Sequence, residues 1–401
     1  LYVHVPFCAR LCWYCGCNTR VIHRTESIGD YVALLREEVA MVQAHLPAAL
    51  RARAIHLGGG TPNMLRVDDL AVLFDTLRAV LKVDPDAEIA AELDPAQVDP
   101  AWVRAAAYHG LSRASLGVQD LSEAVQRAVN RIEPFEVVAR AAGLLRDAGV
   151  KSVNVDLMYG LPLQRTADVI STLDQVLTLK PDRVALFGYA HVPWMKAHQK
   201  LIRDEDLPGT AERLEQSEAA ADRLEAEGYV AIGLDHFALP GDELAVAARE
   251  GRLRRNFQGY TADPNPTLIG FGVSAIGRLP QGYVQNLPGE LEWRKAVGEG
   301  RLPVARGVAL TDDDRFRAEI IERLMCDLTV DLAAVCARYG RRVDELSGAR
   351  HALERFVGDG LVQWSGDRLT VTDLGRPFMR SACAAFDAHL APEAGRHSRA
   401  L

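Results

Sequence analysis

From residue 2 to about residue 232, short apolar runs alternate with longer stretches in which apolar residues recur every three or four positions. The short runs predict strands, and the periodic stretches predict amphipathic helices. We expect strands at residues 2–5, 54–57, 88–93, 113–118, 152–157, 183–187 and 230–232, and helices at residues 31–45, 68–82, 100–109, 135–148, 166–179 and 210–227. Regular alternation of strand and helix predicts a parallel sheet covered by helices.

Polar, glycine-rich and reactive residues follow the ends of these expected strands. Cys8 follows the first strand, Gly58-Gly-Gly60 the second, Gln119 the fourth and His191 the sixth. In a barrel of parallel strands the carboxyl ends share one rim, and active sites lie on that rim. We therefore expect residues 1–290 to form an α/β fold, a partial or closed TIM-like β/α barrel, with the active site on its rim.

The pattern changes after residue 311. We expect helices at residues 312–328, 331–339 and 343–357, a hairpin at 361–364 and 368–371, and a last helix at 373–389. Helices followed by a hairpin predict a smaller helical, winged-helix-like domain over residues 291–401. Acidic residues accompany the arginines there, so the sequence favours a packing or lid domain on the barrel over a DNA-binding module.

The composition fits a folded protein with a sizeable core, since 48% of residues are apolar and 25% are charged. The formal net charge of −8 supplies no bulk positive field, so we expect no nucleic-acid partner. No run of about 18 apolar residues occurs, and we expect no membrane span. The chain opens at Leu1, inside an apolar run, which leads us to expect a preceding N-terminal segment.

Four of the seven cysteines, Cys8, Cys12, Cys15 and Cys17, lie within ten residues. Three thiolates in an eight-residue loop can converge on one centre, and thiolates are the normal ligands of iron–sulfur clusters. Three protein ligands would leave one iron of a four-iron cluster without a protein ligand. An open coordination site of this kind indicates that the cluster takes part in a reaction and does not only transfer electrons. Zinc, with Cys17 as the fourth ligand, remains an alternative. Three scattered cysteines are interpreted as reduced thiols, which indicates the cytoplasm: Cys326, Cys336 and Cys383.

The spacing Cys8-X3-Cys12-X2-Cys15, with Tyr14 before the last cysteine, resembles the signature of radical S-adenosylmethionine (SAM) enzymes. Motifs along nearly the whole chain resemble, in order, the oxygen-independent coproporphyrinogen III dehydrogenase (HemN) family. They are Tyr2-Val-His-Val-Pro-Phe-Cys8, Cys15-Gly-Cys17-Asn18, Gly58-Gly-Gly-Thr-Pro62, Glu92-Leu-Asp-Pro95, Gly117-Val-Gln-Asp120, Val129-Asn-Arg131, Asp156-Leu-Met-Tyr-Gly-Leu-Pro162, Tyr189-Ala-His191, Asp235-His-Phe237, Arg255-Asn-Phe-Gln-Gly-Tyr260, Gly272-Val-Ser-Ala-Ile276 and His397-Ser-Arg399.

The resemblance implies that Cys8, Cys12 and Cys15 ligate a [4Fe-4S] cluster beside two SAM molecules. Positions that match contacts to the first SAM are Tyr2, Gly59, Glu92 and Ile276; those that match contacts to the second are Tyr14, Gly60, Thr61, Gln119, Arg131, Asp156 and Ala190. A glycine backbone lets a ligand approach closely and offers N–H donors to the amino acid part of SAM. A carboxylate can bind the ammonium group or the ribose hydroxyls of SAM, and an arginine can pair with its carboxylate. Taken singly, these residues also fit tight turns or salt bridges at the rim.

The resemblance further implies oxidative decarboxylation of two propionates of coproporphyrinogen III to vinyl groups, giving protoporphyrinogen IX in heme biosynthesis. In the family, a 5′-deoxyadenosyl radical from SAM removes a hydrogen atom from the propionate β-carbon, and CO₂ and one electron then leave. An unidentified reductant and an unidentified electron acceptor are therefore required, and we expect a monomer.

Tyr2, Cys17 and Gln258 are expected near this chemistry, with Cys17 matching a distinctive family residue that does not ligate the cluster. Cys17 and residues 257–260 distinguish the dehydrogenase from a heme-chaperone branch, which binds heme without decarboxylation and is the alternative function. The substrate carries four carboxylates, for which Arg20 and Arg24 are candidates, although both also fit solvated positions in a loop.

Overall fold

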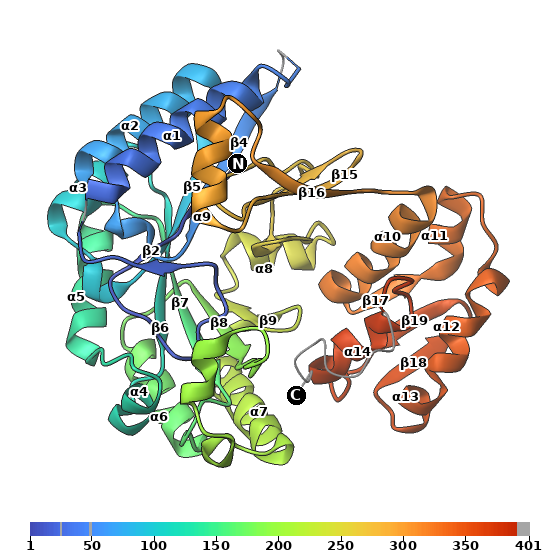
Figure 1. Ribbon diagram of the computed structural model, residues 1–401. Helices are drawn as coiled ribbons and strands as arrows, with labels where there is room; N and C mark the ends of the chain where they lie inside the picture. Colours follow the sequence, from blue (N-terminus) through green and yellow to red (C-terminus); the bar gives the residue numbers. More distant parts are fainter. Residues whose placement is uncertain (25, 48–49, 391–401) are drawn as a thin grey trace.

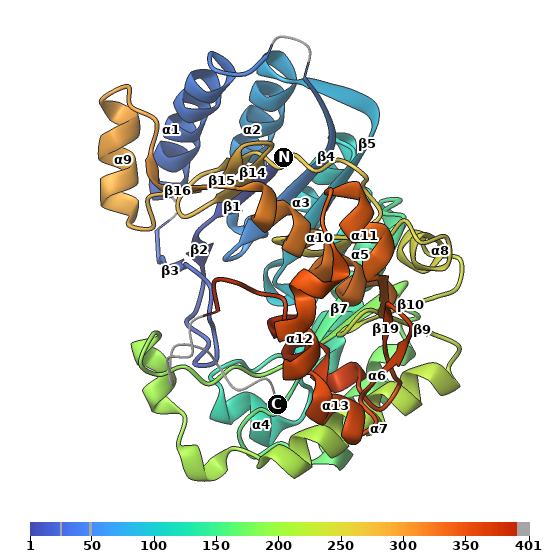
Figure 2. The same ribbon diagram turned by 90° about the vertical axis from the view of Figure 1, so that its right-hand side faces the viewer.

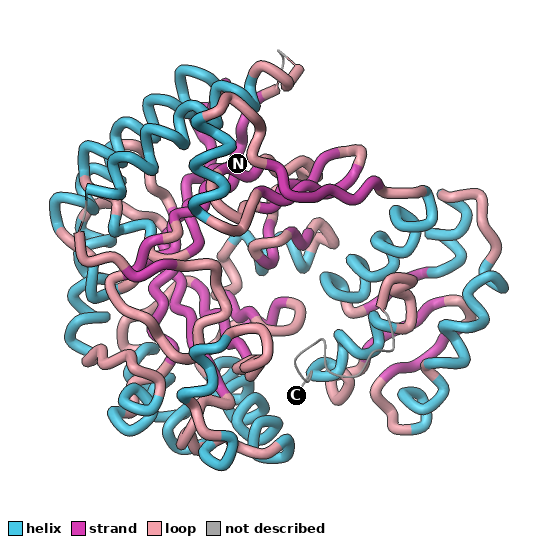
Figure 3. Tube along the Cα trace, in the orientation of Figure 1, coloured by secondary structure: helices cyan, strands magenta, loops and turns pink. Residues whose placement is uncertain are grey.

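The computed structural model of the protein describes residues 1–24, 26–47 and 50–390. A sheet of nine strands lies at its centre (Figures 1 and 3). The strands are β1 (Tyr2–Val5), β4 (Arg51–Gly59), β5 (Lys82–Leu93), β6 (Arg113–Gln119), β7 (Ser152–Tyr159), β8 (Arg183–Gly188), β9 (Val230–Ile232), β10 (His236–Ala238) and β13 (Gly270–Phe271). Each of the seven expected strands is present, and most are longer than expected.

Across the sheet the order is β13-β1-β4-β5-β6-β7-β8-β10-β9. The strands from β13 to β8 are parallel. Within the described ranges no pairing joins β13 to β9, so the parallel strands form a partial TIM-like barrel. The expected α/β fold class is confirmed.

The expectation that residues 230–232 continue the parallel pattern is wrong. β9 pairs antiparallel with β10, which itself pairs antiparallel with β8. Only residues 233–235 separate β9 from β10, and a parallel connection needs a crossover of a dozen or more residues. The sequence pattern therefore located this strand but not its direction.

Helices cover the outer face of the sheet (Figures 1 and 2). They are α1 (Glu26–Gln43), α2 (Val67–Val80), α3 (Pro100–Tyr108), α4 (Glu123–Ala128), α5 (Phe135–Asp147), α6 (Thr166–Leu177) and α7 (Thr210–Ala226), with the short α8 (Glu243–Arg249) following β10. In α1, the buried Ile28, Tyr31, Val32, Leu35 and Val39 recur every three or four residues, which is the pattern that predicts a helix. These side chains join the strands in one hydrophobic core.

A second hydrophobic core lies in the C-terminal part, which Figure 1 shows in orange and red beside the barrel. Its elements are α10 (Asp312–Asp327), β17 (Thr329–Asp331), α11 (Leu332–Arg338), α12 (Ser347–Ala352), α13 (Glu354–Gly358), β18 (Val362–Ser365), β19 (Arg368–Val371) and α14 (Met379–Ala384). Helices and a small antiparallel sheet in this order match the expected winged-helix-like pattern. No described helix has the length and apolar character that crossing a bilayer requires.

Two helices of this part are shorter than the sequence predicts. The stretch 343–357 is divided into a 3₁₀ turn (Val343–Leu346), α12 and α13, and it contains the weak helix formers Ser347 and Gly348. The last helix begins at Met379 because Pro377 cannot lie in a helix interior. The motif at residues 397–399 lies outside the described residues.

Residues between the two cores form elements that the sequence analysis did not anticipate. They are the hairpin β11 (Arg254–Asn256) and β12 (Gly259–Thr261), the three-stranded sheet β14 (Ile276–Leu279), β15 (Gly282–Asn286) and β16 (Val304–Ala309), and helix α9 (Glu290–Gly298). The fully buried Trp293 of α9 belongs to the barrel core and lies 4.8 Å from Tyr31 between ring centroids. A domain division at residue 290 stays a prediction.

Candidate active site

The three cysteines of the motif lie in a loop that follows β1. Cys8 ends the short strand β2 (Phe7–Cys8), which pairs with β3 (Arg20–Val21) at the far end of the loop. The N–H of Cys15 donates to the carbonyl of Cys12 at 3.1 Å, which closes a tight turn. Cys8, Cys12, Cys15 and Cys17 all line one cavity of about 200 Å³. The loop therefore brings the sulfurs to a common space, as the spacing predicts.

A neighbouring segment, residues 196–199, holds the loop by its carbonyl groups. Lys196 donates to the carbonyl of Cys17 at 3.0 Å, and His198 donates to that of Cys15 at 2.7 Å. The amide of Gln199, which is 1% exposed, donates to the carbonyl of Tyr14 at 2.8 Å. These three donors follow β8, and the sequence analysis missed them because nothing in the spacing relates them to the cysteines.

The thiols fit the ligand set of an iron–sulfur cluster. In the described part of the chain, no three Cys, His, Asp or Glu side chains are grouped closely enough to hold a single metal ion. Thiolates on one zinc ion lie about 2.3 Å from it, whereas the irons and sulfides of a cluster hold its thiolates further apart. Three thiols that line one cavity are the donor set that a cluster needs. Hydrogen bonding from Cys17 lowers the pKa of Cys15 to about 6, and burial raises the pKa of Cys8 to about 11.

Arg131 links the cysteine cavity to a buried acidic pair. Its guanidinium lies 3.6 Å from the Cys12 sulfur, 3.1 Å from the Glu133 carboxylate and 3.5 Å from that of Asp94. Arg10 adds a second positive charge, at 3.1 Å from Asp94 and 3.3 Å from Glu133. The buried Nε of Arg131 has no hydrogen-bond partner among the described residues, so it can still meet an anionic group in the cavity.

The glycine motif allows strands to approach each other and the cysteine loop. A Cβ on Gly60 would lie 3.0 Å from the Cys8 sulfur, and one on Gly59, which has φ +114°, would lie 2.7 Å from the ring of His4. The N–H of Gly59 donates to Glu92 at 3.2 Å, and that of Gly60 donates to a carbonyl of β1 at 2.7 Å. Both N–H groups thus have protein acceptors, and close approach is what these glycines provide.

Two carboxylates and a strained glutamine lie at or near the C-terminal ends of β5, β6 and β7. Glu92 hydrogen-bonds His56 Nε2 at 2.9 Å; burial alone would raise its pKa, but this bond and the Gly59 N–H lower it overall. Burial and the nearby charge of Glu92 raise the pKa of Asp156 to about 7, against a 2.6 Å hydrogen bond from Asn154. Gln119 has φ +70° beside a register shift, and such strain is concentrated at functional sites.

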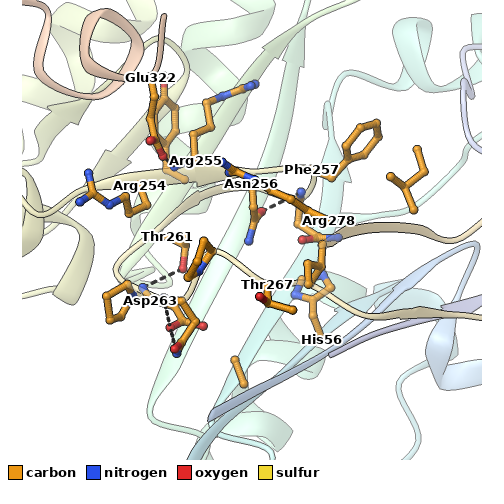
Figure 4. Close-up of a pocket in the computed structure, with 18 of the residues that line it drawn as sticks. His56, Arg254, Arg255, Asn256, Phe257, Thr261, Asp263, Thr267, Arg278 and Glu322 are labelled. Atoms are coloured by element: carbon orange, nitrogen blue, oxygen red, sulfur yellow. Dashed lines mark hydrogen bonds between the residues drawn. The ribbon is translucent and has the colours of Figure 1, made fainter. Parts of the chain in front are cut away.

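A second cavity, of about 1240 Å³, adjoins the cysteine cavity (Figure 4). Glu92, Ser115 and Asp156 line both, so the two spaces meet at these side chains. The large cavity is bordered by the barrel, the β11–β12 hairpin and helix α10. Eight arginines line it: Arg113, Arg183, Arg254, Arg255, Arg278, Arg315, Arg323 and Arg338.

Most predicted site residues meet around these cavities. Besides the four cysteines, those at the cysteine cavity are Tyr14, Gly59, Gly60, Thr61, Glu92, Gln119, Arg131 and Asp156. Gln258 and Ile276 line the large cavity.

Four predicted residues line neither cavity: Tyr2, Ala190, Arg20 and Arg24. The hydroxyl of Tyr2 bonds His4 at 3.0 Å, and the carbonyl of Ala190 accepts from Gln199 at 3.3 Å. Arg20 is half exposed and pairs with Glu290 at 3.1 Å.

Comparisons with known proteins agree with this geometry. Residues 2–176 match the radical SAM superfamily, and residues 310–378 match the HemN C-terminal domain. The chain is 47% identical to an oxygen-independent coproporphyrinogen III oxidase from Bradyrhizobium diazoefficiens, over 100% of this chain and 89% of the relative. The chain belongs to this oxidase family. It is also 44% identical to coproporphyrinogen III oxidase, anaerobic 1, from Cereibacter sphaeroides, over 100% of this chain and 88% of the relative.

Among solved structures, the coproporphyrinogen III oxidase HemN of Escherichia coli, described as a radical SAM enzyme, matches with a TM-score of 0.93. The sequence identity is 37%, and the match covers 97% of this chain and 90% of the other. The resemblance found in the sequence is therefore confirmed, and the heme-chaperone alternative is not favoured. Membership in the radical SAM superfamily implies an iron–sulfur cluster and SAM, which the cysteine cavity fits.

Proposed function

We propose that this chain is an oxygen-independent coproporphyrinogen III oxidase that converts two propionates of coproporphyrinogen III into vinyl groups. The observation that carries this proposal is the meeting of two unlike cavities at Glu92, Ser115 and Asp156. One has the thiols for a cluster, and the other is large and lined by arginines, which suits a substrate with several carboxylates.

The chain's own residues would bind, orient and shield the reactants. Cys8, Cys12 and Cys15 would hold the cluster, which together with SAM supplies a radical able to take a hydrogen atom from a propionate β-carbon. Glu92, whose lowered pKa keeps it charged, places negative charge at the junction, where it would attract the cationic SAM. Helix α10 borders the large cavity and would keep water away from the reacting carbon.

We propose two SAM molecules per chain. Support comes from the distribution of the residues assigned to each. Three of the four residues assigned to the first lie around the junction, with Gly59 at the cysteine cavity, Ile276 at the large cavity and Glu92 at both, whereas Tyr2 lines neither cavity. All but one of those assigned to the second line the cysteine cavity; the exception is Ala190. We further propose a cytoplasmic location, which the seven free cysteines support.

The test is anaerobic reconstitution with iron and sulfide, followed by reduction and addition of SAM and coproporphyrinogen III. A four-iron signal in electron paramagnetic resonance, a divinyl product, and one 5′-deoxyadenosine per vinyl group formed would support the proposal. Bound zinc in place of the cluster, or heme binding with no vinyl product, would contradict it. The triple variant of Cys8, Cys12 and Cys15 to alanine is the matched control, and it should lose both the signal and the product.

A further inference from the structure

The eight arginines of the large cavity fall into two groups. Five have partners within the protein, such as Arg113 with Glu88 at 2.8 Å and Arg183 with Asp242 at 2.7 Å. The others of this group are Arg315, Arg323 and Arg338, which bind backbone carbonyls or nearby carboxylates. These five guanidiniums have partners in the fold, although the buried Nε of Arg113 has no hydrogen-bond partner among the described residues.

Arg254, Arg255 and Arg278 form the second group, which has no carboxylate within 4.0 Å and no side-chain hydrogen bond among the described residues. Figure 4 shows them around the pocket, Arg254 and Arg255 from β11 and Arg278 from β14. All three are partly buried. The Nε of Arg255 is fully buried without a partner, and one face of its guanidinium lies over the ring of Tyr260 at 5.6 Å.

The charges of Asp235 and Asp327 act on Arg255 and Arg254 from beyond ion-pair distance. The side-chain donors of all three arginines are nevertheless unused among the described residues, and a partly buried guanidinium with unused donors gains from a bound anion. Three such groups around one cavity therefore point to a ligand with more than one carboxylate. Arginine suits this task because its planar fork binds a carboxylate through two hydrogen bonds. Phe257, which is 66% exposed in the turn between β11 and β12, also lines the cavity and offers an apolar surface to a macrocycle.

We propose that Arg254, Arg255 and Arg278 bind the two propionates that the product keeps, and so turn the reacting propionate toward the cysteine cavity. The proposal rests on the proposed function for the identity of the substrate. The three arginines line only the large cavity, whereas the junction carries the acidic side chains Glu92 and Asp156. Pairing of the two retained propionates with these arginines would hold the macrocycle in the large cavity, and a reacting propionate is then left free to extend toward the junction.

The experiment measures binding and does not depend on turnover. Coproporphyrin III, the stable oxidised macrocycle with the same four propionates, is titrated into the reconstituted protein and followed by fluorescence. We expect Arg254→Gln, Arg255→Gln and Arg278→Gln each to weaken binding by about 10-fold or more, since a hydrogen bond to a charged group contributes about 1.5–3 kcal/mol. Arg104→Gln is the control, because Arg104 is exposed on α3, outside the cavity, and its loss changes the net charge equally.

Protoporphyrin IX tests which propionates the arginines bind, since it keeps only the two that survive the reaction. The three variants should weaken its binding by the same factor as that of coproporphyrin III. Weakened binding of coproporphyrin III alone would overturn the assignment to the retained propionates. Unchanged binding of both, or no binding of coproporphyrin III by the unmodified protein, would overturn the proposal entirely.

Arg255→Lys keeps the charge but removes the fork, and we expect it to bind with intermediate affinity. The lysine variant also shows whether the glutamine variant loses binding because it misfolds. A midpoint of urea unfolding equal to that of the unmodified protein shows that each variant is folded. Turnover in the same preparations separates this proposal from the proposed function. Arginine-dependent binding without vinyl product would contradict only the function, whereas turnover with arginine-independent binding would contradict only this inference.

Discussion

Replacing Glu92 with glutamine should weaken SAM binding while leaving the fold intact. Glu92 is the last residue but one of β5, its carboxylate lies at the junction of the two cavities, and 41% of its side chain is exposed. Burial raises the pKa of this carboxylate, but the hydrogen bonds from His56 and Gly59 lower it by more. The pKa is therefore below its usual value, and the group stays charged at neutral pH. A hydrogen bond to such a charge contributes about 1.5–3 kcal/mol, which corresponds to a 10- to 150-fold weaker affinity once the charge is removed. Isothermal titration calorimetry with SAM and the cluster-loaded protein measures this change.

Glu88→Gln is the matched control. Glu88 lies four residues earlier on the same strand, pairs with Arg113 at 2.8 Å and lines only the large cavity. We expect its SAM affinity to stay within about threefold of the unmodified protein, because its charge is already compensated. Equal weakening in both variants would refute the reasoning, since a general loss of negative charge would then explain the result. Unchanged affinity in Glu92→Gln would refute it as well.

Three other variants test the packing and protonation of the site. The pKa of Asp156 is raised to about 7 by burial and then by the charge of Glu92, so its contribution to stability is full below pH 4 and lost as the pH rises through 7. Asp156→Asn should therefore stabilise the apoprotein more at pH 8 than at pH 5, by about 1–3 kcal/mol in urea unfolding; an equal effect at both pH values would contradict this. Gly60→Ala should reduce the iron bound on reconstitution, because the added Cβ would lie 3.0 Å from the Cys8 sulfur. Gly143→Ala is the control, because a Cβ at Gly143 would have no atom within 4 Å. This control should bind iron normally and gain up to about 1 kcal/mol of stability. Gln199→Ala should destabilise the protein by about 1–3 kcal/mol and make the cluster more labile to chelators, because the Tyr14 carbonyl loses its donor. A cluster as resistant as that of the unmodified protein would contradict the role of Gln199 in holding the cysteine loop.

The sequence pattern located the barrel strands and the cysteine cavity because both depend on local information. Apolar runs define the strands, and the residue after a strand end lies at the rim whatever the length of the connection. Glu92, Gln119 and Asp156 lie at or near the C-terminal ends of three successive strands of the sheet, and they meet at one cavity for this reason. The direction of β9 was not predictable in the same way, because it depends on the very short turn to β10.

The sequence did not single out the arginines of the large cavity; for the substrate carboxylates it offered Arg20 and Arg24, which also fit solvated positions, and that expectation stays a prediction. Neither lines the arginine-rich cavity. What distinguishes Arg254 and Arg278 is the absence of a protein partner, and this depends on which acidic side chains the tertiary structure brings near. The exposure of an arginine can be predicted from its neighbours in the sequence. Its ion-pair partner cannot, when that partner lies 50 or more residues away, as Asp242 does from Arg183.

The central claim is that the two cavities act as one site that meets at Glu92, Ser115 and Asp156. Coproporphyrinogen III labelled with deuterium at the β-carbons of its propionates tests this claim most directly, with 5′-deoxyadenosine analysed by mass spectrometry after turnover. If the reacting propionate reaches the junction, deuterium will appear in 5′-deoxyadenosine, in step with the vinyl groups formed. Vinyl product with unlabelled 5′-deoxyadenosine would contradict the account.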